Sequence, residues 1–389
     1  MDRSFPADWP APGPIDLSVH DLPHESSDIE WWYIHAHVTL TDGRPVSLFA
    51  SFFRQRDRSE ARGVDRHGHT VLWGISDVDS RRYLPQVLAD IEAPAITLER
   101  LNAQKDERDP HIRESLAELV ETGVLPHPDQ RAHAEAVIAT DRLHLEYDDN
   151  TFTKLDDGRY RMVLRGDDGS LGCDITFRPK KGPIRHGDSG VVRGVSGGDM
   201  FYYFFPRCDI EGTVRMDGED TGIASGNAWY DHEFGGTYVS KEEREAKEAA
   251  AKAAGSEDPR GKMEYAWNWA AVQLNNGCEL TAAVLIDPRD GRVMETRAVV
   301  VHADGSTTRT TEMTLTPSTK PEDQWRSCRT FRVYPLAYRC TVPCLGVDLQ
   351  IKACFADQEF MTLIAKPAFW EGRCDVAGSF DGEAVAGFA

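Results

Sequence analysis

The chain has 389 residues, of which 40% are hydrophobic, and a formal net charge of −20 at pH 7. This length exceeds that of an ordinary small domain and predicts two domains, while the hydrophobic content excludes a disordered chain. The strong negative charge argues against a nucleic-acid backbone or an anionic membrane surface as a partner.

Targeting signals are not visible in the sequence. Residues 1–6 (MDRSFP) lack the basic start and apolar run of a signal peptide, and no stretch approaches the ~18 apolar residues of a membrane span. The eight cysteines include one close pair, Cys340 and Cys344, without the second pair that a zinc site needs. We therefore expect a cytoplasmic protein with reduced, mostly buried thiols and no integral membrane segment. The oligomeric state stays open.

Most of the chain is predicted to be β-structure. Segments rich in Val, Ile, Thr, Phe, Tyr and Trp alternate with tight-turn pairs such as Asp42-Gly43 and Asn276-Gly277. Strands at hairpin spacing, with almost no helix between them, favour antiparallel barrels or sandwiches. The clearest predicted strands are residues 30–39, 46–53, 161–164, 200–205, 265–274, 280–286 and 297–301.

Two segments interrupt this pattern. Residues 84–147 are polar and helix-prone, with apolar residues on one helix face between Ile112 and Val120. Residues 240–255 begin with a capping-box pattern and end at a glycine, which predicts an exposed helix. Either segment could be a lid over a barrel mouth. We predict an N-terminal domain over residues 1–236, with a helical insertion at about 84–147, and a C-terminal domain over residues 237–389.

The first aromatic cluster is segment 30–38 (EWWYIHAHV). On a strand, Tyr33 falls on one face, while Glu30 and Trp32 fall on the other, core-facing side. A buried glutamate needs a partner, and Arg54 could form with Glu30 a pair that closes a barrel, with catalysis by Glu30 as the alternative. Glu30, Trp32 and Tyr33 are also candidate substrate-binding residues.

Two further aromatic segments follow. Segment 200–207 (MFYYFFPR) carries rings on both faces, so that one face packs in a core and the other meets a second sheet or a pocket. Trp267 and Trp269 repeat this theme on a single face. Tyr202, Trp267 and Trp269 are therefore candidate walls of a pocket for an apolar ligand.

The most informative segment is 229–236 (WYDHEFGG). Strand alternation places Trp229, Asp231 and Glu233 on one face and His232 on the other, with the two carboxyls about 6–7 Å apart. In an apolar pocket such carboxyls raise each other's pKa, so one can stay protonated near pH 7 and protonate an alkene. In the alternative interpretation, these acidic residues pair with arginines or cap turns.

No metal or cofactor is predicted. His35 and His37 share a strand face and could offer two metal nitrogens, but no convincing third ligand is near. A Gly-rich phosphate loop opening a helix is absent. Ser196, in Gly-Val-Ser-Gly-Gly, is the nearest approach to a nucleophile motif and lacks the strand–turn–helix context.

Eight short motifs occur in order along the chain: EWWY at 30–33, FFR at 52–54, KG at 181–182, YY and PR between 202 and 207, WYDHE at 229–233, DQE at 357–359 and FWEG at 369–372. This set resembles the AttH-like and carotenoid 1,2-hydratase family. The resemblance implies two lipocalin-like β-barrel domains packed side by side, with a ligand pocket at or near their junction.

The resemblance also implies a chemistry. Hydratases of the family add water across a terminal double bond of an acyclic carotenoid without a cofactor, and fungal decalin-forming Diels–Alderases look like relatives with the same plan. The family's key aspartate corresponds to Asp231. Two positions earlier the hydratases have a tyrosine where this chain has Trp229, and their His-Asp-His is Tyr230-Asp231-His232 here.

The sequence therefore favours a cofactor-independent acid/base enzyme that hydrates or cyclises an alkene-bearing hydrophobic natural product, such as a terpenoid, polyene or polyketide. Asp231 would be the proton donor or hydrogen-bonding acid, tuned by His232 or Glu233, in a pocket lined by Trp229, Tyr202, Trp267 and Trp269. A Diels–Alder-type pericyclase needs only a shaped cavity and a hydrogen bond and stays open. A non-catalytic carrier of hydrophobic ligands and an esterase-like hydrolase stay open as well.

Overall fold

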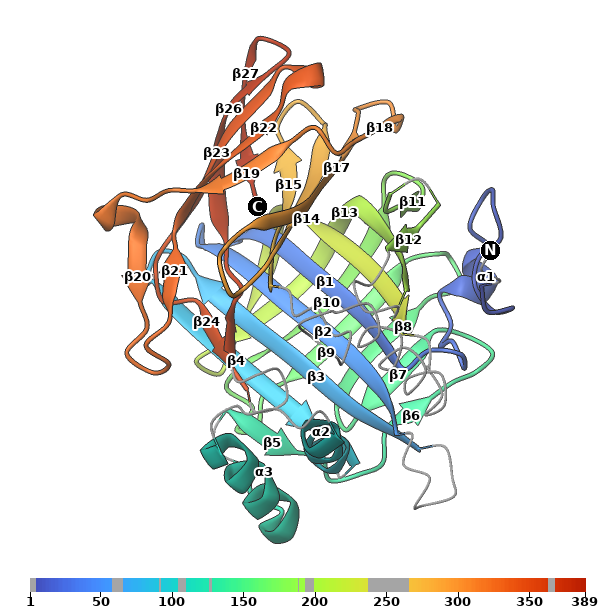
Figure 1. Ribbon diagram of the computed structural model, residues 1–389. Coiled ribbons are helices and arrows are strands. Elements are labelled where there is room, and N and C mark those ends of the chain that lie inside the picture. The colour runs from blue at the N-terminus through green and yellow to red at the C-terminus, as the bar shows by residue number, and fades with distance from the viewer. Residues whose placement is uncertain are drawn as a thin grey trace, which may run out of the picture.

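The computed structural model of the chain consists of two large curled sheets with a few short helices (Figure 1). The predicted all-β class with two lipocalin-like units is confirmed. The helix predicted at 240–255 and Ser196 lie outside the described part of the chain. The structure describes residues 5–57, 66–90, 92–103, 110–125, 128–187, 189–192, 199–236, 266–362 and 368–389.

The first sheet has fourteen strands, all before residue 236. Their order is β5-β4-β3-β2-β1-β14-β13-β10-β9-β8-β7-β6, with β11 and β12 paired to β13, so β1 lies beside β14. The strands are β1 Ile29–Leu40, β2 Pro45–Asp57, β3 Arg66–Asp77, β4 Arg82–Ala89, β5 Asp129–Arg131, β6 Val137–Ile138, β7 His144–Tyr147, β8 Asn150–Lys154, β9 Tyr160–Arg165, β10 Gly172–Pro179, β11 Ile184–Arg185, β12 Val191–Val192, β13 Met200–Met216 and β14 Glu219–Gly235.

The second sheet has nine strands in the order β18-β17-β16-β15-β27-β26-β23-β22-β19. Two small hairpins, β20–β21 and β24–β25, extend it along the side of the first sheet (Figure 1). The strands are β15 Ala266–Leu274, β16 Glu279–Ile286, β17 Val293–Val301, β18 Thr307–Thr310, β19 Thr314–Pro317, β20 Gln324–Arg326, β21 Val333–Pro335, β22 Ala337–Val342, β23 Val347–Ala353, β24 Glu359–Met361, β25 Ala368–Trp370, β26 Cys374–Phe380 and β27 Glu383–Phe388.

Helices are few and short among the described residues. They are α1 Leu17–His20, α2 Glu92–Ala103 and α3 Pro110–Thr122, together with the 3₁₀ turns η2 Pro321–Asp323 and η3 Pro343–Leu345. The helices α2 and α3 occupy only the middle of the segment predicted to be helix-prone, because its first residues pair with β3 as β4 and its last ones form β5 to β7. No helix among the described residues is long and apolar enough to cross a membrane.

Strand alternation gives the first sheet an aromatic core on its inner face. Trp32, Ile34, Ala36 and Val38 of β1 all point inward and are almost completely buried, as their spacing predicts. Each large apolar side chain buried there contributes about 1.5–3 kcal/mol to folding. At the end of β14, Gly235 has a φ of 144°, and a Cβ there would lie 2.4 Å from the carbonyl oxygen of Asp199. Only glycine fits at this crossing.

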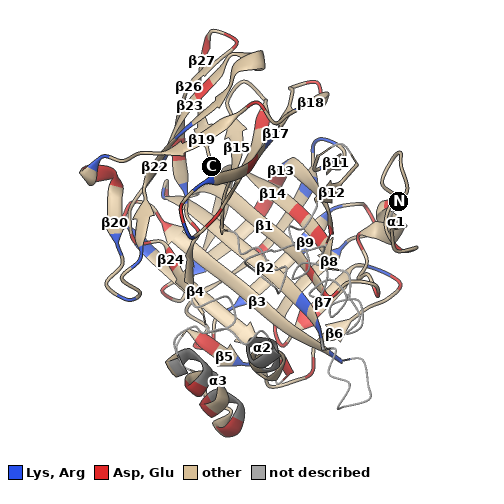
Figure 2. Cartoon of the chain, in the orientation of Figure 1, with Lys and Arg blue, Asp and Glu red and all other residues tan. Residues whose placement is uncertain are grey.

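The outer face of the first sheet packs against the second sheet. One apolar cluster joins Phe204 and Trp229 of the first sheet to Val299 of β17, and another joins Phe49 of β2 to Phe360 of β24. Acidic and basic residues are interspersed over both sheets and their loops (Figure 2). Both faces of β1 and β14 are therefore covered, one by the core and one by the second sheet.

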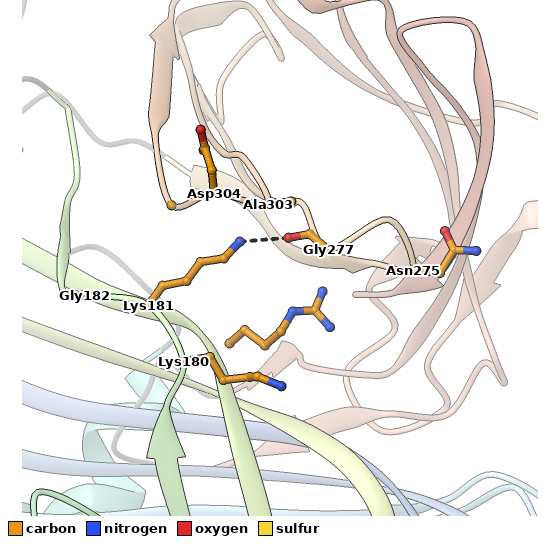
Figure 3. Close-up of a pocket in the computed structure, with 9 residues that line it drawn as sticks. Lys180, Lys181, Gly182, Asn275, Gly277, Ala303 and Asp304 are labelled. Carbon is orange, nitrogen blue, oxygen red and sulfur yellow. Dashed lines mark hydrogen bonds between the residues drawn. The ribbon is translucent and has the colours of Figure 1, made fainter.

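A buried ion cluster also joins the two sheets. Glu279 of β16 is completely buried and accepts from Lys181 Nζ at 2.7 Å and from Arg207 Nε at 2.5 Å. Lys181 also donates to the carbonyl of Gly277, as Figure 3 shows. Both cations line a hollow of about 680 Å³ between the sheets, with Asn275 on its far side. Because both cations are already paired with Glu279, we interpret this hollow as part of an ion-paired contact between the sheets.

We predict that Glu279→Gln lowers the free energy of unfolding by about 3 kcal/mol, because it leaves two buried cations without a counterion. Denaturant titration measures this change. Asp209→Asn, which breaks the exposed pair with Lys180, is the matched control and should change stability by less than about 1 kcal/mol. Equal effects of the two substitutions would contradict the structural role of Glu279.

Candidate functional site

The pairing of β1 with β14 sorts the predicted site residues onto two faces. Tyr33 lies opposite Asp231, and Trp32 lies opposite His232. Because directly paired residues point to the same side of a sheet, Asp231 and Tyr33 face the junction, whereas His232 and Trp32 face the inner core. Of the three predicted catalytic residues, the structure thus brings Asp231 and Glu233 together and places His232 behind them.

Asp231 is buried at the junction, with 3% of its surface exposed. The indole Nε1 of Trp229 donates to Asp231 Oδ1 at 2.8 Å. Burial raises the pKa of Asp231 to about 8, against the opposing effect of hydrogen bonds from Trp229 and Tyr202, and the nearby charge of Glu371 adds to the rise. This carboxyl is therefore protonated at neutral pH.

Two more carboxyls with raised pKa face the same junction. Burial, and then the charge of Asp231, raises the pKa of Glu233 to about 8. Glu371 follows β25 of the small β24–β25 hairpin and accepts a hydrogen bond from the Tyr33 hydroxyl at 2.7 Å. Burial raises the pKa of Glu371 to about 7. The first sheet and this hairpin thus contribute acids to one site.

Aromatic rings surround these acids. Trp229 is stacked between His35, at 5.7 Å between ring centroids, and Phe204, at 5.0 Å. From β15, Trp269 meets the ring of Tyr33 edge-on at 5.7 Å. Such π faces attract positive charge, so the same surroundings that keep Asp231 neutral can stabilise a cation.

Two further predicted substrate-binding residues, Tyr202 and Trp267, differ from each other in burial. Tyr202 is buried and stacks on His186 at 4.4 Å, in the same intersheet cluster as Trp229. Trp267, by contrast, is 66% exposed and lies away from Asp231, although it shares a strand face with Trp269.

Glu30 lies on the inner face, in a hydrogen-bonded network. It accepts from His24 Nδ1 at 2.8 Å and from His232 Nε2 at 2.9 Å, and Arg54 Nη1 lies 3.6 Å from it. Burial alone would raise the pKa of Glu30, but the two histidines hold it down to about 2. The predicted Glu30–Arg54 pair is therefore present as part of a larger set.

Three residues of this network could also supply metal ligands. His24, Glu30 and His232 bring one ligand atom each within 4.8 Å of one another. Their separations of 2.8 and 2.9 Å are hydrogen-bond distances, and the Arg54 cation stands beside them. The arrangement fits an ionised glutamate between two imidazoles better than it fits a metal site.

Glu371 is absent from the predicted site residues, although the FWEG motif at 369–372 contains it. An acid set among aromatic residues is the same signal that singles out Asp231. With Tyr33 bonded to Glu371, the site can hold one protonated acid on the first sheet and a second acid/base on the β24–β25 hairpin. This arrangement suits proton transfer to an apolar substrate.

Comparison with known proteins identifies the family of the chain. The model of the AttH-like family matches residues 123–247 and 255–388, which together make up more than half of the chain. The chain belongs to the AttH-like family. Within this AttH-like protein, the EWWY, WYDHE and FWEG motifs converge at the junction, where they supply Tyr33, Asp231 and Glu371.

Solved structures share the fold. A candidate AttH protein from Nitrosomonas europaea matches with a TM-score of 0.67 and 21% identity, over 97% of each chain. Kievitone hydratase from Nectria haematococca matches with a TM-score of 0.64 and 15% identity, over 95% of this chain and 89% of that one. CghA, in a crystal structure with Sch210972, matches with a TM-score of 0.47 and 12% identity, over 93% and 87%. No curated protein matches the chain in sequence.

The raised pKa of Asp231 predicts a pH-dependent stability difference. The folded state keeps this proton up to about pH 8, whereas the unfolded chain releases it near pH 4, so the wild type loses stability as pH rises between these values. Asp231→Asn has no such proton to lose. We expect the free energy of unfolding of Asp231→Asn, relative to wild type, to rise by about 2–5 kcal/mol between pH 4 and pH 8.

Denaturant titrations at several pH values measure this difference. Asp348→Asn is the control, because Asp348 is exposed and its hydrogen bonds with Arg339 lower its pKa. Its difference from wild type should stay constant between pH 5 and pH 8. A constant difference for Asp231→Asn as well would show that Asp231 is ionised throughout.

Proposed function

We propose that this protein is a cofactor-independent acid/base enzyme that hydrates or cyclises an alkene in a hydrophobic natural product. The observation that carries the proposal is the buried Asp231, whose raised pKa keeps it protonated among aromatic rings at the junction of two sheets. A neutral carboxylic acid in apolar surroundings can donate its proton to a carbon–carbon double bond.

The first step transfers the Asp231 proton to one alkene carbon, and the π electrons form the new C–H bond. The other carbon becomes a cation, and the rings of Tyr33 and Trp269 stabilise it, because both faces of Trp229 are covered by His35 and Phe204. Burial supports this step, because electrostatic stabilisation is stronger where water is excluded.

The second step decides between hydration and cyclisation. In hydration, a water molecule adds to the cation and loses a proton to the Asp231 carboxylate or to Glu371. In cyclisation, a second double bond or a hydroxyl of the substrate adds instead, and a proton returns to Asp231. Glu371 is placed for the first route, because its pKa of about 7 lets it accept a proton at neutral pH.

The named relatives are consistent with this assignment. Kievitone hydratase shares the fold with this chain, and its name states that it is a hydratase. A pericyclic reaction would use Asp231 only as a hydrogen-bond donor, and a carrier would not use its proton at all. The proposed enzyme would therefore incorporate hydrogen from the solvent, and in hydration also oxygen, into its product. A pericyclase or a carrier would incorporate neither.

Isotope labelling tests the proposal. The protein is incubated with kievitone, an acyclic carotenoid or a linear polyene in D₂O containing H₂¹⁸O, and the masses of the products are measured by mass spectrometry. Hydration incorporates both deuterium and ¹⁸O, and cyclisation through a cation incorporates deuterium alone. Asp231→Asn should lower turnover by about 10²- to 10⁴-fold, since Asn can still accept from Trp229 but has no proton to donate.

Asp348→Asn is the control for a surface aspartate on the second sheet and should keep full activity. Product formation without solvent deuterium would replace the acid mechanism by a pericyclic one. Binding of these compounds without conversion, with Asp231→Asn unchanged in affinity, would make the protein a carrier.

A further inference from the structure

Arg373 is a buried cation at the same junction. It follows Glu371 by two residues, in the connection from β25 to β26, and only 7% of its surface is exposed. Its guanidinium stacks on Phe388 at 4.3 Å, and Nη1 makes only long contacts, to the Val46 carbonyl at 3.4 Å and to Ser47 Oγ at 3.5 Å. Its Nε has no hydrogen-bond partner among the residues that the structure describes.

Arg373 also differs from comparable cations in this chain. Arg54, an arginine buried to the same degree, lies 2.7 Å from a carboxylate oxygen of Glu25 and 3.6 Å from one of Glu30. Lys181 pairs with Glu279. In the described ranges of the chain, no carboxylate oxygen lies within 4.0 Å of Arg373. A buried guanidinium without a counterion is costly, so proteins retain one where an anion binds.

Two neutral histidines lie on this side of β1: His37 is next to Arg373, and the ring of His35 lies 5.2 Å from that of His37. His37 Nδ1 lies 2.8 Å from Ser47 Oγ, the same hydroxyl that Arg373 contacts. Burial lowers the pKa of His35 to about 3, and burial, with the neighbouring His35 and Arg373, lowers the pKa of His37 well below its ordinary value, so both rings are neutral. Among the described residues, the Nε2 atoms of both are buried without a hydrogen-bond partner. In the tautomer whose Nδ1 accepts from Ser47, Nε2 of His37 carries the proton and can donate it to a ligand.

The register of β1 relates these donors to Asp231. Tyr33 lies opposite Asp231, and His35 lies opposite Trp229. His37 is four residues from Tyr33 on the same face, which is about 13 Å along the strand. An acid therefore stands at one end of this face and a cation with two imidazoles at the other, with the Trp229 indole between them.

We propose that Arg373, with His35 and His37, binds the carboxylate of the substrate, so that the substrate is an elongated unsaturated acid whose reacting double bond lies about 13 Å from its carboxylate. Arg373 suits this group because its planar guanidinium matches the geometry of a carboxylate. This inference rests on the proposed role of Asp231. It adds the chemical class of the substrate, an acid, and excludes a hydrocarbon, which has no carboxylate for Arg373 to bind.

Fluorescence titration with cis-parinaric acid, a conjugated tetraene fatty acid, tests the proposal against its methyl ester. The acid should bind wild type at least about tenfold more tightly than the ester. Arg373→Gln should weaken binding of the acid by about 10- to 100-fold and leave the ester unchanged, with Arg373→Lys in between. Arg339→Gln removes a cation paired on the surface with Asp348 and should change neither.

Three outcomes overturn the proposal: no preference of wild type for the acid, no binding of either probe, or an equal loss of acid and ester in Arg373→Gln, which a purely structural arginine would produce. Asp231→Asn separates this proposal from the proposed function, because it should leave the affinity for the acid within about twofold. If Asp231→Asn retains turnover while the Arg373-dependent preference holds, the carboxylate site stands and the acid mechanism fails.

Discussion

Contact between the outer face of the first sheet and the second sheet is the constraint on which the site depends. Glu279 forms ion pairs with Lys181 and Arg207 across this contact. Apolar clusters around Trp229 and Phe49 pack the two sides together. Asp231 lies on β14, whose inner face packs in the core of the first sheet. Without the second sheet its carboxyl would meet water and ionise like any surface aspartate. The packing of the two sheets therefore creates the unusual proton affinity of this group.

The neighbouring residues Asp231 and His232 lie on opposite faces of β14, and the charges around them differ. On the inner face, His232 meets an ionised Glu30 that is held by two histidines and an arginine. On the outer face, Asp231 has an indole and a tyrosine for neighbours and, within the described part of the chain, no ion-pair partner, so burial raises its pKa. Burial is similar on both sides. What separates a structural carboxylate from a chemical acid here is the presence or absence of positive charge.

The sequence predicted the strands and the face of Asp231 because alternation is a local property. Residues 229–233 alone separate Asp231 from His232, and the structure has the same separation. Glu371 could not be placed in this way, because it lies 338 residues from its partner Tyr33. Arg373 gave no signal either, since whether an arginine has a counterion depends on which distant acids the fold brings to it. Trp267 looked equivalent to Trp269 by spacing, but only Trp269 packs against rings of the first sheet, whereas Trp267 is exposed.

The chemistry proposed for this site requires that Asp231 be protonated at neutral pH. Infrared spectroscopy of protein labelled with ¹³C at the aspartate carboxyl measures this state directly, because the label shifts aspartate bands away from those of Glu233 and Glu371. We expect wild type to show the carbonyl band of a protonated aspartic acid at pH 7, absent from Asp231→Asn and lost as pH rises through about 8. Identical spectra of wild type and Asp231→Asn in this region at pH 7 would contradict the account.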